Sequence, residues 1–210
     1  MNNTNRIKIA IQKSGKLSQD SKDFLQQVGI SVPSVDRQMI YRSEDMPVDI
    51  IFVRDDDIPS LICNKVCDFG IVGSNVLEEY FLSKKKKRIQ VLKELDFSKC
   101  RLSIAAKGEL ETSSMLDLNG KKIATSYPSI LEDILEKQNI KSEIVYMSGC
   151  VEIAPSLGVA DYICDIVSTG NSLRENNLKE LYNVFESQAL LIANNNISDQ
   201  RLSLFKEMAV

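Results

Sequence analysis

Histidine is absent from all 210 residues of this sequence. Its absence excludes a Ser-His-Asp triad, a Cys-His pair, a histidine general base and most catalytic zinc sites. Any chemistry must therefore use carboxylates, lysine, arginine, hydroxyl groups, backbone dipoles or a bound hard cation.

The sequence also lacks long apolar runs and a surplus of basic residues. No segment is apolar over the length of a membrane span, and residues 1–6 are polar, unlike the start of a signal peptide. We therefore expect a soluble, cytoplasmic protein without a membrane partner. The net charge of −3 provides no general basic surface, so nucleic acid is not an expected partner. The five cysteines, an odd number, are expected to be reduced thiols.

Strand-like and helix-like segments alternate along the chain. Strands are expected at 6–12, 38–42, 48–53, 68–73, 91–95, 102–106, 121–125, 143–147, 161–167 and 190–193. Helices are expected from Ser18, as N-cap, to Gly29, after Pro59, and at 75–82, 128–139, 151–157, 172–176 and 198–208. This alternation predicts an α/β fold with mostly parallel sheets. Ligands of such folds bind beyond the carboxyl ends of the strands, where the polar turns of this chain fall.

The sharpest functional signal is the segment from Asp165 to Ser172, DIVSTGNS. An apolar strand ends near an acid, and a turn of small and hydroxyl residues then leads into a helix. Small residues let backbone N–H groups converge on a phosphate, and the hydroxyls add further donors. The acid is placed to hold a sugar diol or the water shell of a cation. The alternative is an ordinary capped strand-to-helix turn.

Other turns carry weaker signals. Lys13-Ser14-Gly15-Lys16 is small and basic, but a solvated turn explains it equally well. Arg54-Asp55-Asp56-Asp57 is typical of either helix capping or a cationic partner such as Mg²⁺. Glu152 is an acid at another strand-to-helix turn, where it could simply complement the helix dipole. Arg101 opens an apolar strand and could point into a cleft.

Taken in order, several motifs resemble the ATP phosphoribosyltransferase family, which catalyses the first step of histidine biosynthesis. The matching stretches are IAIQKSGKLS, MPVDI, VRDDDIP, DFGIVG, NVLEE, LDFSKCRLSIA, GKKIATSYP, VEIAP and ADYICDIVSTGNSL. They extend from near residue 6 to near residue 194. No single motif is decisive, but their order is highly specific.

The resemblance implies a two-lobed α/β fold like that of type II periplasmic binding proteins, with a central cleft. Lobe I would contain residues 1–96 and 185–210, and lobe II residues 97–184. The motifs are of the long-form style, and long-form members continue into a regulatory C-terminal domain. A chain ending at Val210 is expected to lack that domain, either as a cut catalytic core or as a naturally short form. The implied reaction joins ATP to the ribose of phosphoribosyl pyrophosphate, releases pyrophosphate and requires Mg²⁺.

The resemblance also implies roles for individual residues. The phosphoribosyl group would be bound by Glu152, Asp165, Ser168, Thr169, Gly170, Asn171 and Ser172. ATP and pyrophosphate would be bound by Lys13, Ser14, Lys16, Arg54, Asp55, Asp56, Arg101, Thr125 and Tyr127. Catalytic roles would belong to Lys16, Arg54, Glu152 and Asp165. Mg²⁺ would be held mainly by substrate phosphates, with Asp165 as the candidate protein ligand.

The sequence departs from the family pattern at several positions. The family usually has arginine at Lys16, glutamate at Ser74, and glycine at Ser60, Lys65 and Asn177. A catalytically weakened or regulatory relative is therefore one alternative function, and a solute-binding protein of the same fold is another. Family membership implies a homo-oligomer, at least a dimer. A short-form member would also have a regulatory partner resembling histidyl-tRNA synthetase.

Overall fold

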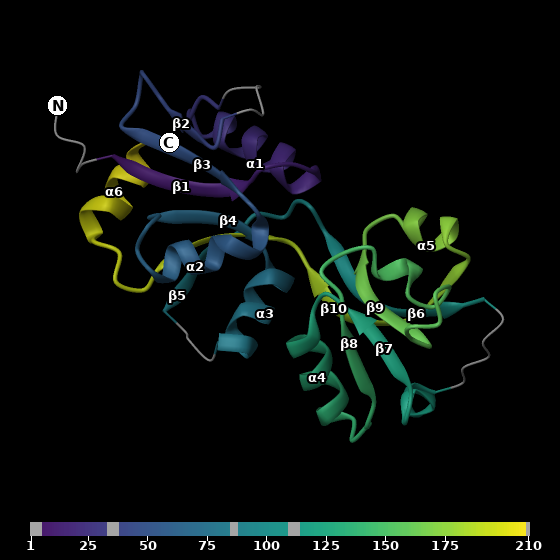
Figure 1. Ribbon diagram of the computed structural model, residues 1–210. Helices are drawn as coiled ribbons and strands as arrows, with labels where there is room; N and C mark the ends of the chain where they lie inside the picture. Colours follow the sequence, from purple (N-terminus) through teal and green to yellow (C-terminus); the bar gives the residue numbers. More distant parts are fainter. Residues whose placement is uncertain (1–5, 33–37, 85–87, 109–113, 209–210) are drawn as a thin grey trace. The chain divides into compact units, whose positions relative to one another are not determined.

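The computed structural model describes residues 6–32, 38–84, 88–108 and 114–208. The chain forms two compact units, one made of Met1–Ser98 with Gln188–Val210 and the other of Lys99–Ser187. Each unit is built on its own β-sheet (Figure 1). No helix within the described ranges has the length and apolar character needed to cross a membrane.

Unit 1 is a six-stranded sheet with helices packed against it, in the strand order β2-β3-β1-β4-β11-β5. Its elements are β1 (Ile7–Gln12), α1 (Lys16–Gln27), β2 (Ile40–Arg42), β3 (Val48–Val53), the 3₁₀ helix η2 (Asp55–Asp57), α2 (Ile58–Cys63), β4 (Phe69–Gly73), α3 (Ser74–Lys84), β5 (Ile89–Glu94), β11 (Ala189–Asn194) and α6 (Asp199–Met208).

The core of unit 1 follows from the alternation of apolar residues in its strands. Ile7, Ile9 and Ile11 of β1 are fully buried between neighbouring strands and helices. Figure 1 shows α6, the last helix, beside the first strand β1. This position agrees with the stacking of Phe205 of α6 on Phe69 of β4, whose ring centroids lie 4.3 Å apart. The two chain segments of unit 1 therefore share one hydrophobic core.

Unit 2 is a five-stranded sheet in the order β10-β6-β9-β7-β8. Its elements are β6 (Cys100–Lys107), the 3₁₀ helix η3 (Met115–Leu118), β7 (Lys122–Thr125), α4 (Pro128–Lys137), β8 (Glu143–Tyr146), the 3₁₀ helix η4 (Val151–Ile153), β9 (Tyr162–Val167), α5 (Asn171–Glu175) and β10 (Leu178–Ser187). One face of the sheet, including Ala105, Ala124 and Ile163, packs under Val151 of η4 and Leu173 of α5. This face also carries the candidate site.

Both sheets are mixed, so the prediction of mostly parallel sheets is wrong. In unit 1, β1 pairs in parallel with β3 and β4, but β11 is antiparallel to β4 and β5, and β2 is antiparallel to β3. In unit 2, β7 is parallel to β8 and β9, whereas β6 is antiparallel to β9 and β10. In each unit, the strand that runs against both of its neighbours is the first one after the chain crosses into that unit, β6 in unit 2 and β11 in unit 1. They are not joined to their neighbours by the helical crossovers that parallel pairing requires.

Two local predictions also need correction, and one strand was missed. Helix α1 begins at Lys16 after Gly15, and Ser18 is a buried residue inside the helix rather than its N-cap. Gly15 can make this turn because its φ of 91° is accessible to glycine. The predicted helix 151–157 is reduced to the 3₁₀ helix η4 followed by turns. The strand β10 was not predicted at all.

The five cysteines are free thiols in different environments. Cys63, Cys67 and Cys164 are buried, Cys100 is half-buried and Cys150 is exposed. Burial in apolar surroundings raises the pKa of Cys67 to about 11, so this thiol stays protonated at neutral pH.

Candidate active site

The loop between β9 and α5 is anchored at both ends by buried side chains. Val167 and Leu173 lie in the core of unit 2, while Ser168 and Thr169 between them are exposed. Gly170 has a φ of 76°, a left-handed conformation that lets the chain turn tightly into α5. The amides at the start of a helix have no partner inside it, so the loop presents N–H groups and hydroxyls to an anion.

Arg174 holds this loop from the following turn of α5. Its Nη1 donates to the carbonyl oxygen of Thr169 at 3.4 Å, and its Nη2 donates to Oδ1 of Asn171. A Cβ at Gly170 would lie 3.4 Å from Nη1 of this guanidinium, an ordinary contact with the end of a flexible side chain. Glycine at 170 is therefore favoured by its φ.

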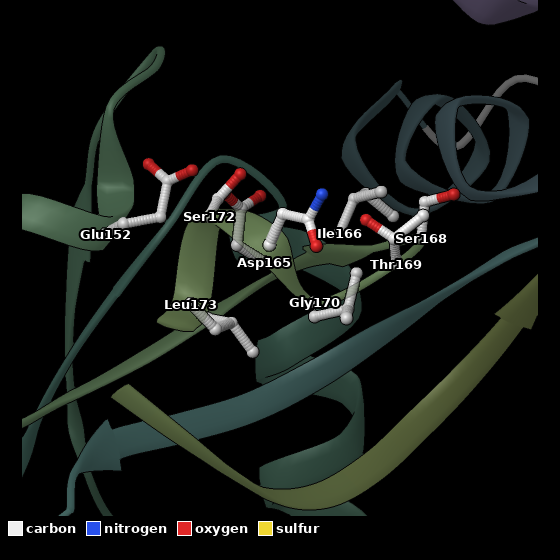
Figure 2. Close-up of a pocket in the computed structure, with 10 residues that line it drawn as sticks. Glu152, Asp165, Ile166, Ser168, Thr169, Gly170, Ser172 and Leu173 are labelled. Atoms are coloured by element: carbon white, nitrogen blue, oxygen red, sulfur yellow. The ribbon is translucent and has the colours of Figure 1, made fainter. Parts of the chain in front are cut away.

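Two carboxylates lie beside the loop. Asp165 projects from β9, and Glu152 comes from η4, which packs against β9 (Figure 2). Burial raises the pKa of Asp165 most and the nearby charge of Glu152 adds to the increase, while the backbone hydrogen bond of Ile166 opposes it, so that the pKa is about 6. Figure 2 shows the oxygen atoms of Glu152, Asp165 and Ser172 on one side, while Leu173 points away from them. Such a pair of carboxylates can accept hydrogen bonds from sugar hydroxyls or attract a cation.

The carboxylates and the loop line one pocket with a volume of about 460 Å³, including its open mouth. Its lining residues are Glu152, Asp165, Ile166, Val167, Ser168, Thr169, Gly170, Asn171, Ser172 and Leu173. The structure thus brings together the whole set of residues predicted for the phosphoribosyl group. Ile166, Val167 and Leu173 were not predicted, because their apolar character is typical of core residues.

Three further predicted residues belong to unit 2 but are not among the residues lining that pocket. Arg101 lies on β6 opposite Val167 and pairs with Glu180 of β10. Thr125 is buried at the end of β7, where its Oγ1 accepts a hydrogen bond from the amide of Tyr127 at 2.9 Å. This bond shapes the turn from β7 into α4, which begins directly after Tyr127.

The predicted residues of unit 1 gather at the carboxyl ends of two adjacent parallel strands. Lys13 follows β1 and Arg54 follows β3, and the Lys13 amide donates to the Val53 carbonyl oxygen at 2.8 Å. Ser14 and Lys16 are exposed at the start of α1. The basic groups of this turn therefore adjoin Arg54 at one edge of the sheet.

The acids after Arg54 have local partners. Arg54 Nε lies 3.1 Å from Oδ1 of Asp56, and both side chains are exposed. The Oδ1 of Asp55 accepts the amide of Asp56 at 3.0 Å. Burial nevertheless raises the pKa of Asp55, and the charge of Asp56 adds to this increase. Asp57 stands at the N-cap position of α2, but neither η2 nor α2 has a side-chain capping hydrogen bond, so the capping explanation of this acidic run is not supported.

The described residues contain no cluster of three or more His, Cys, Asp or Glu side chains that could hold a metal ion. The donors at the pocket are two carboxylates, Glu152 and Asp165. This is the donor set expected where Mg²⁺ binds chiefly through substrate phosphates and takes one or two ligands from the protein.

Comparison with protein families tests the family resemblance. A family model described as HisG, ATP phosphoribosyltransferase, matches residues 54–209, about three quarters of the chain. The chain belongs to the HisG family. HisG proteins are ATP phosphoribosyltransferases, glycosyltransferases that carry out the first step of histidine biosynthesis.

Solved structures place this HisG chain in a wider fold class. An ATP phosphoribosyl transferase (HisG:HisZ) complex from Thermotoga maritima contains a chain with 25% identity and a TM-score of 0.77, covering 97% of this chain and 98% of that one. A histidine kinase sensor domain with similarity to periplasmic binding proteins has 13% identity, a TM-score of 0.63 and coverages of 98% and 89%. A substrate-binding protein of an amino acid ABC transporter has 12% identity, a TM-score of 0.60 and coverages of 97% and 91%. The fold is therefore the two-lobed, periplasmic-binding-protein-like α/β fold that the resemblance implied.

Proposed function

We propose that the pocket of unit 2 binds the 5-phosphate and ribose of phosphoribosyl pyrophosphate in the HisG reaction. The observation that carries this proposal is the position of the Ser168–Ser172 loop beside Asp165 and Glu152 in one pocket. The loop supplies N–H and hydroxyl donors for the phosphate, and the carboxylates accept hydrogen bonds from the ribose hydroxyls. A single pocket would thus offer hydrogen-bond donors to the phosphate and hydrogen-bond acceptors to the ribose hydroxyls.

We propose that basic groups bind ATP and the departing pyrophosphate. The basic groups are Lys13, Lys16 and Arg54 in unit 1 and Arg101 in unit 2. The other contacts of these substrates would be Ser14, Asp55 and Asp56 in unit 1 and Thr125 and Tyr127 in unit 2. The position of Lys13 beside the end of β3 supports this assignment, because it brings a lysine close to Arg54, whose charge Asp56 offsets only at the surface. Lys16 acts as a point charge, where arginine would add bidentate hydrogen bonds.

The reaction condenses ATP and phosphoribosyl pyrophosphate into phosphoribosyl-ATP and pyrophosphate. We propose that it proceeds by attack of ATP N1 on C1 of the ribose, with inversion, through an oxocarbenium-like state. The protein residues position the two substrates and neutralise the leaving group, which requires no histidine proton shuttle. Glu152 and Asp165 would hold Mg²⁺ together with the substrate phosphates, and the ion would supply charge neutralisation for the pyrophosphate.

Two substitutions test the phosphoribosyl pocket. Asp165→Asn and Thr169→Val are expected to weaken the binding of phosphoribosyl pyrophosphate about tenfold or more, the size of one lost charge-assisted hydrogen bond, and to change ATP binding much less. Isothermal titration with each substrate and Mg²⁺ measures both affinities. The control is Asp133→Asn, which removes a carboxylate from α4 that pairs with Lys137 outside the pocket. If neither pocket variant altered the affinity for phosphoribosyl pyrophosphate, the assignment of the loop would be wrong.

Formation of phosphoribosyl-ATP, followed with a pyrophosphatase present, separates the enzyme from a weakened relative. Product formation is the expected result. A protein that bound both substrates without forming product would be a catalytically weakened or regulatory member of the family.

We further propose a cytoplasmic assembly with a HisZ-type partner subunit. The support is the Thermotoga maritima relative, which has nearly the same extent as this chain and is part of a HisG:HisZ complex. Native mass measurement of this protein alone and with such a subunit tests the proposal. The expected result is a complex more active than the separate chain, and equal activity with no complex would contradict it.

A further inference from the structure

A carboxylate outside the predicted site is bonded side-on to Arg101. Glu180 of β10 accepts from Arg101 Nε at 2.5 Å on Oε1 and from Nη2 at 2.6 Å on Oε2. The hydroxyl of Ser103, which is 1% exposed, donates to the same Oε1 at 2.7 Å. Glu180 thus receives three hydrogen bonds from two residues of the neighbouring strand.

These residues lie next to the pocket on one face of the sheet of unit 2. In the antiparallel ladder between β6 and β9, Arg101 is opposite Val167 and Ser103 is opposite Asp165. Side chains opposite one another in such a ladder are on the same face of the sheet. Val167 and Asp165 both line the pocket, so the Arg101–Ser103–Glu180 group adjoins it through the strand β9.

The pairing fixes the direction of the guanidinium. Arginine has five N–H groups in a rigid plane, and two of them are directed at Glu180, so the other three face away from it. The side chains of Arg101 and Glu180 are 33% and 28% exposed, so the pair is accessible to a ligand on its outer side. The bonds from Arg101 hold the pKa of Glu180 below its ordinary value, and Glu180 therefore stays ionised at neutral pH.

We infer that Glu180, held by Ser103, is a positioning residue that orients Arg101 toward a substrate phosphate. This inference rests on the proposed function of Arg101 in binding ATP or pyrophosphate. A long arginine side chain loses much rotational freedom when it binds a ligand, and fixing it beforehand reduces that loss. Glu180 also offsets the charge of Arg101, so Arg101 contributes directed hydrogen bonds more than long-range attraction.

A second carboxylate on β10 provides a matched control. Glu186 lies directly opposite Arg101 in the β10–β6 ladder, and its charge adds to the raised pKa of Arg101. Its Oε1, however, accepts from Nδ2 of Asn183. Glu180→Gln and Glu186→Gln therefore make the same chemical change near Arg101, but only the first alters the side-on pair.

A double-mutant cycle on the full chain tests the inference. Steady-state kinetics with ATP and phosphoribosyl pyrophosphate are compared for Glu180→Gln, Arg101→Ala, the double variant and Glu186→Gln. Glu180→Gln is expected to raise KM for one substrate about tenfold with little change in kcat, as for one lost charge-assisted hydrogen bond. The double variant should match Arg101→Ala alone, because Glu180 acts through Arg101. Glu186→Gln should leave both KM values unchanged.

The outcomes separate this inference from the function it rests on. If Arg101→Ala weakens substrate binding but Glu180→Gln does not, or if their effects simply add, the positioning role of Glu180 is overturned. If Arg101→Ala leaves both affinities unchanged, the phosphate-binding role of Arg101 fails, and the positioning role of Glu180 fails with it. Thermal unfolding identifies a folding defect. If Glu180→Gln does not fold, Ser103→Ala replaces it, with an expected rise in KM of about threefold, smaller because both bonds between Arg101 and Glu180 remain.

Discussion

The carboxylate of Glu152 lies close enough to Asp165 to raise the pKa of that residue, although burial is the larger cause. The two residues belong to different elements, η4 and β9, that pack against each other. Two neighbouring acids repel one another when both are ionised, unless a cation or a proton intervenes. In the free pocket the charge of Glu152 therefore disfavours ionisation of Asp165, and a bound cation would offset this repulsion. The pKa of Asp165 and the pH dependence of stability measure the effect.

Asp165→Asn is expected to stabilise the free protein above pH 6. The native pKa of Asp165 is raised from 3.8 to about 6, so its contribution to stability is fully present below 3.8 and is lost as pH rises through about 6. Asparagine carries no charge to desolvate, so the gain in the free energy of unfolding should reach about 3 kcal/mol at most. Urea unfolding at about pH 8 and about pH 4.5 checks this, with a clearly smaller gain at the lower pH. Equal gains at both pH values would show that the gain does not come from ionisation.

Glu152→Gln is expected to lower the pKa of Asp165. Removing one negative charge makes ionisation of the neighbouring carboxyl easier, while burial still keeps its pKa above the ordinary value. Carbon-detected NMR titration of the Asp165 carboxyl measures the shift, with Glu132→Gln on α4 as a control that leaves the titration in place. A midpoint that stayed at about 6 would mean that the charge of Glu152 does not reach Asp165.

Gly170→Ala is expected to reduce both stability and the affinity for phosphoribosyl pyrophosphate. Alanine disfavours the φ of 76°, at a cost of about 1–2 kcal/mol, and the altered turn shifts the loop that lines the pocket. Gly120 is a matched control with a φ of 74°, where a Cβ would meet nothing within 4 Å and which is not among the residues that line the pocket. Gly120→Ala should lose similar stability in thermal unfolding while its substrate affinity, measured by calorimetry, stays unchanged. A loss of affinity in both variants would contradict a specific role for the loop.

Lys65→Gly and Asn177→Gly are expected to stabilise the protein. These residues have φ values of 59° and 55°, in the left-handed region where family members usually have glycine. The gain should be about 0.5–1 kcal/mol at Lys65 and smaller at Asn177, because asparagine tolerates this region better. Asn64→Gly is the control, since its φ of −87° suits any residue and glycine there should destabilise. Urea unfolding measures all three, and no gain at Lys65 would show that its backbone is not strained.

Local patterns allowed much of the fold and of the pocket to be predicted. The alternating isoleucines of β1 and the apolar run of β9 located both strands, and the small residues after β9 located the loop. The signal was strong here because each feature depends on residues adjacent in sequence. Glu152 was singled out for the same reason, as an acid in the first turn after a strand.

Features that depend on distant residues were not predictable. Arg101 and Glu180 are 79 positions apart, and nothing in either local sequence indicates the other. Strand β10 was missed because two register shifts, at Glu180/Tyr182 and Asn183/Phe185, break its alternation of polar and apolar residues. The antiparallel pairing of β11 with β4 and β5 was also missed. It depends on how the chain re-enters unit 1 after unit 2, and the periodicity of apolar residues carries no information about that path. Ser103 offered one usable signal, a single hydroxyl within the apolar strand LSIAA.

The insertion of β11 between β4 and β5 has a consequence for biosynthesis. A ribosome completes all of unit 2 before it makes β11, so the nascent chain can close the second sheet while the first still lacks an inner strand. Until translation reaches residues 189–194, the edges of β4 and β5 that β11 will cover are open to pairing with other chains. The sheet edges of unit 1 are therefore most exposed to aggregation in the interval of synthesis between β5 and β11, while unit 2 is being made.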